Sequence, residues 1–179
     1  MTHRVLAVLA ALLGVLAVFA GTPYPAKLDV RALAAEIAAE DDHVTAIELA
    51  QWIRDRKAGL RIFDLRSAEE FGEYHVPTAK RAALEELVSM RFTPADTIVL
   101  ISDGGAHAAQ AWVLLRASGT PHVYFLRGGL GEWLDDVMNP VGASSDVAAL
   151  SRYFGGLPRS GTPSAKTTNT VREMKRRGC

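Results

Sequence analysis

One short loop holds the residues of this chain that are best placed to do chemistry. The run Ile98–Ile101 is continuously apolar, as a buried strand requires, and residues 108–116 are rich in Ala and Leu, as a helix requires. The residues that join these two elements, called the Ser102 loop below, are Ser102, Asp103, Gly104, Gly105, Ala106, His107 and Ala108. The backbone N–H groups of such a loop converge on one spot, where the positive end of the helix dipole adds to them. The loop therefore predicts a cradle for an anion or for a nucleophile of low pKa.

The chemistry of this cradle depends on Ser102, its first residue. A thiol, with an ordinary pKa of about 8.5, is readily converted to a thiolate by N–H groups and a helix dipole. A serine hydroxyl is not ionised by a field of that size, and oxygen does not carry a transferable sulfur. Asp103 adds negative charge at the rim of the cradle, which opposes an anionic ligand. We therefore expect neither sulfur transfer nor phosphate-ester hydrolysis at Ser102.

Two other kinds of chemistry are considered for this region. His107 follows Ser102 by five residues, a separation that permits a nucleophile–base pair, but no acidic residue is placed to orient the imidazole. A structural role, in which Ser102 hydrogen-bonds backbone groups, is favoured over hydrolysis. The histidines His43, His75, His107 and His122 match no spacing of metal ligands. The sequence therefore predicts no metal site and no cofactor.

Asp64 and Arg66 lie at the end of a second apolar strand, residues 60–65. We expect the two side chains to form a structural ion pair that holds the site loop or a neighbouring turn. A catalytic role for them is the less favoured alternative.

The elements that must position the loop alternate along the chain. Strands are expected over residues 60–65, 98–101 and 123–126. Helices are expected over residues 28–40, 46–57, 84–90, 108–116, 130–137 and 147–154, with a further helix start after Ser67. Thr45 with Glu48, and Ser67 with Glu70, have the spacing of capping boxes. Strands and helices that alternate in this way indicate an α/β fold, a parallel sheet with helices on both faces, whose ligands bind at the carboxyl ends of the strands.

Composition narrows the classes of partner. The 20 basic and 20 acidic residues cancel, so net charge gives no argument for nucleic acid, and no nucleic-acid partner is expected. Cys179 is the single cysteine. The chain therefore forms no disulfide within itself and holds no zinc through cysteine pairs.

The chain divides into four predicted parts: residues 1–25, 26–43, 44–140 and 141–179. The first has a short positive start followed by the uncharged run Val5–Ala20, and both a cleaved signal peptide and a retained N-terminal membrane anchor fit it. Either one places the rest of the chain outside the cytoplasm, in the periplasm or beyond, and a retained transmembrane helix makes the membrane a partner. Residues 26–43 form a connector with helical spacing. Residues 141–179 form a basic extension whose stretch 160–170, rich in Ser, Thr, Pro and Gly, is expected to be disordered.

Three further segments, together with the strand, loop and helix around Ser102, resemble the rhodanese-like domain family. Asp64-Leu65-Arg66, followed by Glu69-Glu70-Phe71, is similar to that family's strand ending in Asp-x-Arg and the acidic-aromatic step after it. Residues 74–79, YHVPTA, resemble its Gly-His-Ile-Pro-Gly-Ala turn, with Tyr74 and Thr78 in place of the two glycines, and His75 has a structural place there. Residues 127–133, RGGLGEW, resemble its Gly-Gly-hydrophobic-x-x-Trp ending.

The resemblance covers about residues 44–140 and implies a sheet of about five parallel strands flanked by helices. It also implies sulfur transfer through a cysteine persulfide, but Ser102 stands where the sulfur-transferring members have cysteine. Gly105 matches the family's glycine, and His107 stands where an arginine is frequent.

We therefore interpret the chain as an exported or membrane-anchored rhodanese-like domain that has lost its nucleophile, a pseudoenzyme of the sulfurtransferase family. It is expected to be a binding or scaffolding module whose Ser102 loop contacts a protein or a small polar ligand. The alternative is an enzyme. In that case Cys179, whose thiolate Lys175, Arg176 and Arg177 would favour, is a sulfur or redox thiol, or Ser102 forms an untypical catalytic site.

Overall fold

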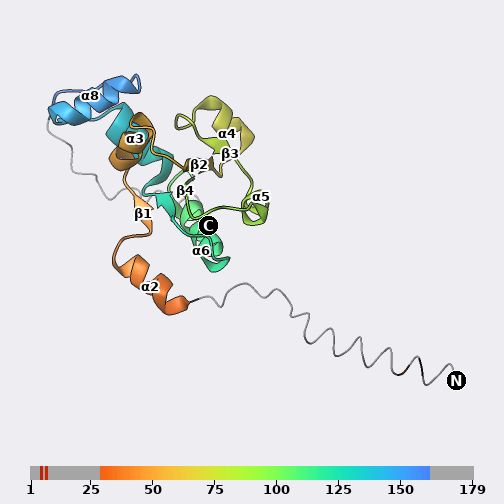
Figure 1. The fold of residues 1–179 in the computed structure, drawn as a ribbon. Coiled ribbons are helices and arrows are strands. Elements are labelled where there is room, and N and C mark those ends of the chain that lie inside the picture. The colour runs from red at the N-terminus through yellow and green to blue at the C-terminus, as the bar shows by residue number, and fades with distance from the viewer. Residues whose placement is uncertain (1–4, 6, 8–28, 162–179) are drawn as a thin grey trace, which may run out of the picture.

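Five parallel strands form the centre of the computed structural model, which describes residues 5, 7 and 29–161 (Figure 1). The strands are β1 (His43–Val44), β2 (Leu60–Asp64), β3 (Lys80–Arg81), β4 (Thr97–Ile101) and β5 (Val123–Leu126). Their order across the sheet is β1-β5-β4-β2-β3, and every neighbouring pair is parallel. The predicted five-stranded parallel sheet is confirmed.

Helices cover both faces of this sheet, as predicted. The helices of the described residues 29–161 are α2 (Val30–Ala38), α3 (Ala46–Arg54), α4 (Ala68–Glu73), α5 (Leu84–Ser89), α6 (Ala106–Ala117), α7 (Gly129–Trp133), the π-helix η1 (Leu134–Met138) and α8 (Ser145–Tyr153). One apolar core lies between the sheet and α3, α7, η1 and α8, and the other lies between the sheet and α5 and α6. Figure 1 shows α3 and α8 together on one side and α5 and α6 on the other.

Local sequence explains why these elements form where they do. Residues Ile98–Ile101 of β4 are 0% exposed, because this strand lies in the middle of the sheet between two helical layers. The two predicted capping boxes begin α3 and α4, with Thr45 and Ser67 accepting hydrogen bonds from the N–H groups of Glu48 and Glu70.

The structure differs from the predicted elements in three places. Strands β1 and β3 were not predicted, since two residues carry no periodicity and these strands exist through pairing with β5 and β2. Helix α6 begins at Ala106, two residues before the predicted start. The helix predicted over 130–137 changes to a π-helix, in which Asn139 N–H bonds the carbonyl of Leu134 five residues back.

Residues beyond 140 also belong to the packed domain. Helix α8 packs on α3 and η1, Leu150 is buried, and Phe154 contacts Trp133 edge-to-face at 5.3 Å between ring centroids. At the other end, α2 is tied to α6 by an ion pair between Glu36 and Arg116.

The predicted signal peptide or anchor lies outside the described residues, apart from Val5 and Ala7, and so does Cys179. Within the part of the chain that is described, no helix combines the length and the apolar character that crossing a bilayer requires.

Candidate functional site

Ser102 directly follows β4, at the carboxyl end of the central strand. Its side-chain oxygen accepts a hydrogen bond from the backbone N–H of Ala108 at 3.2 Å, across the first turn of α6. The residue is only 3% exposed. The hydroxyl therefore satisfies one backbone N–H at the start of α6.

The backbone of the Ser102 loop keeps free donors. Within the described residues, the N–H groups of residues 103–107 donate no hydrogen bond. Gly105 is the N-cap of α6 and has a φ of +87°, a left-handed conformation that suits glycine. This loop can therefore present unpaired N–H groups to an acceptor from outside.

Helix α7 holds the other side of the loop. Leu130 N–H donates to the carbonyl of Ser102 at 2.9 Å, and Gly131 N–H donates to that of Asp103 at 3.4 Å. Gly129 lies so close that a Cβ atom there would be 2.2 Å from the Ser102 carbonyl oxygen. This contact was not predicted from the sequence. The only local feature that could have indicated it is the pair of glycines within residues 127–133.

Asp64 and Arg66 form a buried, bidentate pair beside the loop. Arg66 Nη2 is 2.7 Å from Asp64 Oδ2 and Nε is 3.0 Å from Oδ1, and the two residues are 8% and 0% exposed. This hydrogen bonding to Asp64 is the main reason why the pKa of Arg66 is raised, and the charge of Asp103 adds to it. Arg66 Nη2 also donates to the carbonyl of Tyr74 at 2.7 Å, so the pair holds the turn that follows α4.

Neither histidine of the predicted site forms a hydrogen bond with Ser102 within residues 29–161. His75 is exposed, donates from Nδ1 to the Phe71 carbonyl at 2.9 Å, and stacks on the Phe71 ring at 4.0 Å between centroids. His107 is exposed and makes no hydrogen bond or ion pair within residues 29–161. Among the residues that the structure describes, no group of three His, Cys, Asp or Glu side chains could hold a metal ion.

The turn of residues 74–79 contains the two departures from the family pattern, Tyr74 and Thr78. Tyr74 places its hydroxyl where it accepts a hydrogen bond from Trp133 Nε1 at 2.9 Å. Thr78 has a φ of +67°, the left-handed conformation for which the family has glycine. Neither side chain reaches the Ser102 loop by a hydrogen bond within the described residues.

The sequence of this domain matches a known family. The model of the rhodanese-like domain matches residues 45–136, so the chain belongs to the rhodanese-like domain family. Two solved structures that are similar to it are the rhodanese-like domain of an Anabaena sp. protein and a human single-domain sulfurtransferase. The first is 27% identical over 51% of this chain and 72% of that one, with a TM-score of 0.47. The second is 28% identical over 52% and 95%, with a TM-score of 0.45. None of the curated proteins matches the chain.

Proposed function

We propose that this rhodanese-like domain does not transfer sulfur and acts as a binding or scaffolding module through its Ser102 loop. One observation supports the proposal: Ser102 Oγ is a buried oxygen that bonds a backbone N–H, and the sequence resemblance assigns Ser102 to the position where sulfur-transferring members have a cysteine. Sulfur transfer needs a thiolate that attacks the sulfane sulfur of a donor, and the chain's single cysteine, Cys179, is 77 residues away in sequence.

The charges around the loop favour a neutral hydrogen-bond acceptor. The free N–H groups of residues 103–107 attract acceptors, but the neighbouring carboxylate of Asp103 forms no ion pair within the described residues, and Arg66 is bound to Asp64. Anions are therefore disfavoured relative to carbonyl oxygens, which are abundant on the backbone of a protein partner.

The exposed face of α6 extends this surface without any charge. His107, Gln110, Val113 and Leu114 follow one another along it at helical spacing, and the last two are 41% and 47% exposed. A helical face of this kind next to a loop with free donors favours a protein partner over a small ligand.

The sulfur-transfer part of the proposal is tested with a thiosulfate:cyanide assay on the full chain. In the active family, a thiolate takes the sulfane sulfur of thiosulfate and releases sulfite, and cyanide then removes the sulfur as thiocyanate. We expect the parent, Ser102→Ala and Cys179→Ser to form thiocyanate at the background rate.

Ser102→Cys should gain activity, but only in part, because Asp103 and His107 still differ from the family pattern. Turnover by the parent that Cys179→Ser abolishes would establish the tail thiol as the nucleophile instead, and turnover that requires Ser102 would establish a catalytic serine.

The binding part is tested by comparing variants in a pull-down with crosslinking. Leu114→Asp places a charge on the α6 face, and Leu157→Asp does the same at another exposed leucine, 72% accessible, outside the proposed surface. A protein that is captured by the parent and by Leu157→Asp, but not by Leu114→Asp, is the expected partner. Equal capture by all three chains counts against the α6 face.

We also propose that the module works outside the cytoplasm, in the cell envelope or beyond. The positive start and the uncharged run Val5–Ala20 support this. The intact mass of protein recovered from the host envelope separates a cleaved signal peptide from a retained anchor. Full-length protein found only in the soluble cytoplasmic fraction would contradict export.

A further inference from the structure

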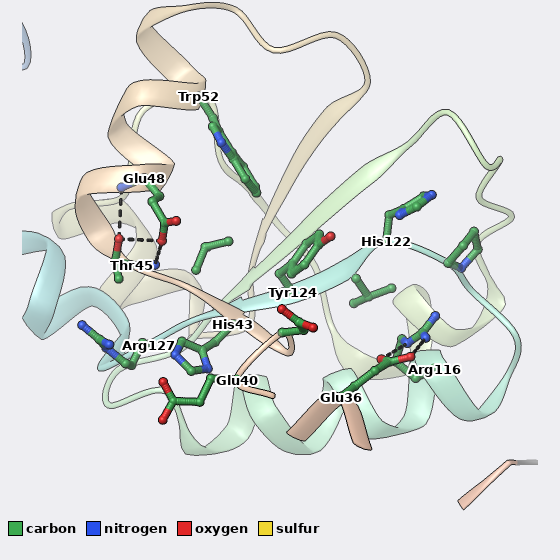
Figure 2. A pocket seen from close by; sticks show the side chains of 14 residues that line it. Glu36, Glu40, His43, Thr45, Glu48, Trp52, Arg116, His122, Tyr124 and Arg127 are labelled. Carbon is green, nitrogen blue, oxygen red and sulfur yellow. Dashed lines mark hydrogen bonds and ion pairs between the residues drawn. The ribbon is translucent and has the colours of Figure 1, made fainter. Parts of the chain in front are cut away.

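A cleft opens along the β1 edge of the sheet, and no residue of the Ser102 loop lines it. Its volume is about 730 Å³, and its walls come from α2, β1, α3, the last turn of α6 and the start of β5. Figure 2 shows Trp52 and Glu48 on α3 at one side, Glu36 and Arg116 at the other, and Tyr124 between them. We call this space the edge cleft. The function proposed above does not involve it.

The edge cleft carries an excess of negative charge. Its two arginines are already paired: Arg116 Nε donates to Glu36 at 3.0 Å, and Arg127 Nη2 lies 3.2 Å from Glu132. Glu40 and Asp41, by contrast, have exposed carboxylates that form no ion pair or side-chain hydrogen bond within residues 29–161. Glu48, also in the lining, accepts hydrogen bonds from Thr45 N and Oγ1, and these keep its pKa below the ordinary value. The cleft thus presents ionised carboxylates to whatever enters it.

The aromatic part of the wall suits a cation with a long apolar stem. Trp52 and Tyr124 meet edge-to-face with ring centroids 5.9 Å apart, and both side chains are half-buried. The ammonium of Lys57 lies 4.1 Å from the centroid of the Trp52 ring and already forms a cation–π contact with it, so in the cleft the two rings offer chiefly an apolar surface. Lysine and arginine pack their methylene stems on such surfaces while their charged heads reach carboxylates.

We propose that the edge cleft binds the basic C-terminal segment of this same chain, centred on residues 172–177. Residues 162–179 contain five Lys and Arg, at positions 166, 172, 175, 176 and 177, against one acid, Glu173. These charges complement the free carboxylates of Glu40 and Asp41. Eighteen residues follow Gly161. A segment of that length reaches up to about 60 Å when extended, against a diameter of about 36 Å for a domain of this size, so every part of the surface is within its range.

The single cysteine provides a direct test, because a nitroxide attached to Cys179 labels this segment without any mutation. The labelled full chain is studied by NMR, in detergent if the apolar N-terminal segment is retained. We expect paramagnetic broadening to be concentrated on amides that line the edge cleft, such as those of His43, His122 and Tyr124. Raising the salt concentration should weaken it, because the Debye length falls from about 30 Å at 0.01 M to about 3 Å at 1 M.

Paired variants establish which charges matter. The tail variant Lys175→Gln/Arg176→Gln/Arg177→Gln and the cleft variant Glu40→Lys/Asp41→Lys should each lose the broadening at the cleft. The matched control Glu69→Lys/Glu73→Lys reverses two exposed carboxylates on α4 and should keep it. The unlabelled spectrum of each variant shows that the domain is folded.

Three results would overturn the proposal. The first is broadening spread evenly over the surface, and the second is broadening centred on the Ser102 loop. The third is broadening at the cleft that disappears on dilution, because it would place the tail of a second copy there. None of these results depends on whether the domain transfers sulfur.

Discussion

Tyr74 shows how a single departure from the family pattern is built into the core. Its hydroxyl accepts the hydrogen bond of Trp133 Nε1, and Trp133 is 0% exposed. A buried indole N–H without an acceptor is costly, so the side chain of Tyr74 has become part of the packing around α7.

We expect Tyr74→Phe to lower the free energy of unfolding by about 1–3 kcal/mol, because it leaves the Trp133 N–H unsatisfied. Urea denaturation measures the change. Tyr124→Phe is the control, since the Tyr124 hydroxyl forms no hydrogen bond within the described residues, and it should change stability by less than about 0.5 kcal/mol. Equal effects of the two substitutions would show that the Trp133 contact contributes nothing.

Thr78 is the opposite case, a departure that leaves strain. A β-branched residue at a φ of +67° is an outlier, and glycine adopts this conformation without penalty. We expect Thr78→Gly to raise the free energy of unfolding by about 1 kcal/mol and the melting temperature by a few degrees. Calorimetry tests this, and a lower melting temperature would mean that contacts of the threonine side chain outweigh the backbone strain.

At the scale of elements, the Ser102 loop and α7 position each other. Gly129→Ala places a methyl group against the carbonyls of Ser102 and Asp103, and we expect it to lower stability by about 2 kcal/mol or more. Gly131→Ala, two residues along α7, meets nothing within 4 Å and should raise stability by about 0.5–1 kcal/mol through helix propensity. Thermal unfolding of both variants checks the pair, and a similar sign for both would refute the close approach.

The capping box of α3 predicts a dependence of stability on acidity. Hydrogen bonds from Thr45 lower the pKa of Glu48 below its ordinary value of 4.5. The folded state therefore prefers the ionised form, so this contribution is fully present above pH 4.5 and is lost as the pH falls through the lower folded-state pKa.

Glu48→Gln keeps an acceptor for the cap but removes the titration, so its stability should fall less than that of the parent between about pH 5 and pH 3. Urea midpoints across this range measure the difference. Glu69→Gln, at an exposed residue of α4 that makes no hydrogen bond within residues 29–161, should keep the acid sensitivity of the parent. If Glu48→Gln is as acid-sensitive as the parent, the cap does not carry this dependence.

The elements that sequence reasoning found were those with a strong local signal. Apolar runs predicted β2, β4 and β5, and the spacing of Thr45 with Glu48 and of Ser67 with Glu70 predicted two helix starts. Strands β1 and β3 depend on partners far away in sequence and carry no such signal. At the site, the strand–loop–helix pattern found Ser102, but the contacts of Gly129 with the loop and of Tyr74 with Trp133 join segments 27 and 59 residues apart. Only the folded chain brings these together.

At the scale of the whole molecule, the packed domain continues beyond residue 136, where the family match ends. Leu150 of α8 is 3% exposed and belongs to the core between the sheet and α3. We expect Leu150→Ala to cost about 2–4 kcal/mol and to leave a single unfolding transition. Denaturation followed by fluorescence and by circular dichroism tests both parts, and a separate early transition would show that α8 unfolds independently.

The shortness of the two outer strands has a consequence for how copies of this domain behave at high concentration. β1 and β3, which end the sheet on either side, contain two residues each. A strand of two residues exposes very few unpaired backbone N–H and C=O groups at the sheet edge. A strand of another molecule therefore finds almost nothing there to pair with. The longer strands, which are rich in Ile, Val and Leu, lie between β1 and β3. They would pair most readily with a strand of another molecule, but none of them is at an edge of the sheet. Concentrated native protein should therefore resist fibrillar association, and β-rich aggregates should appear only after the interior strands are exposed by unfolding.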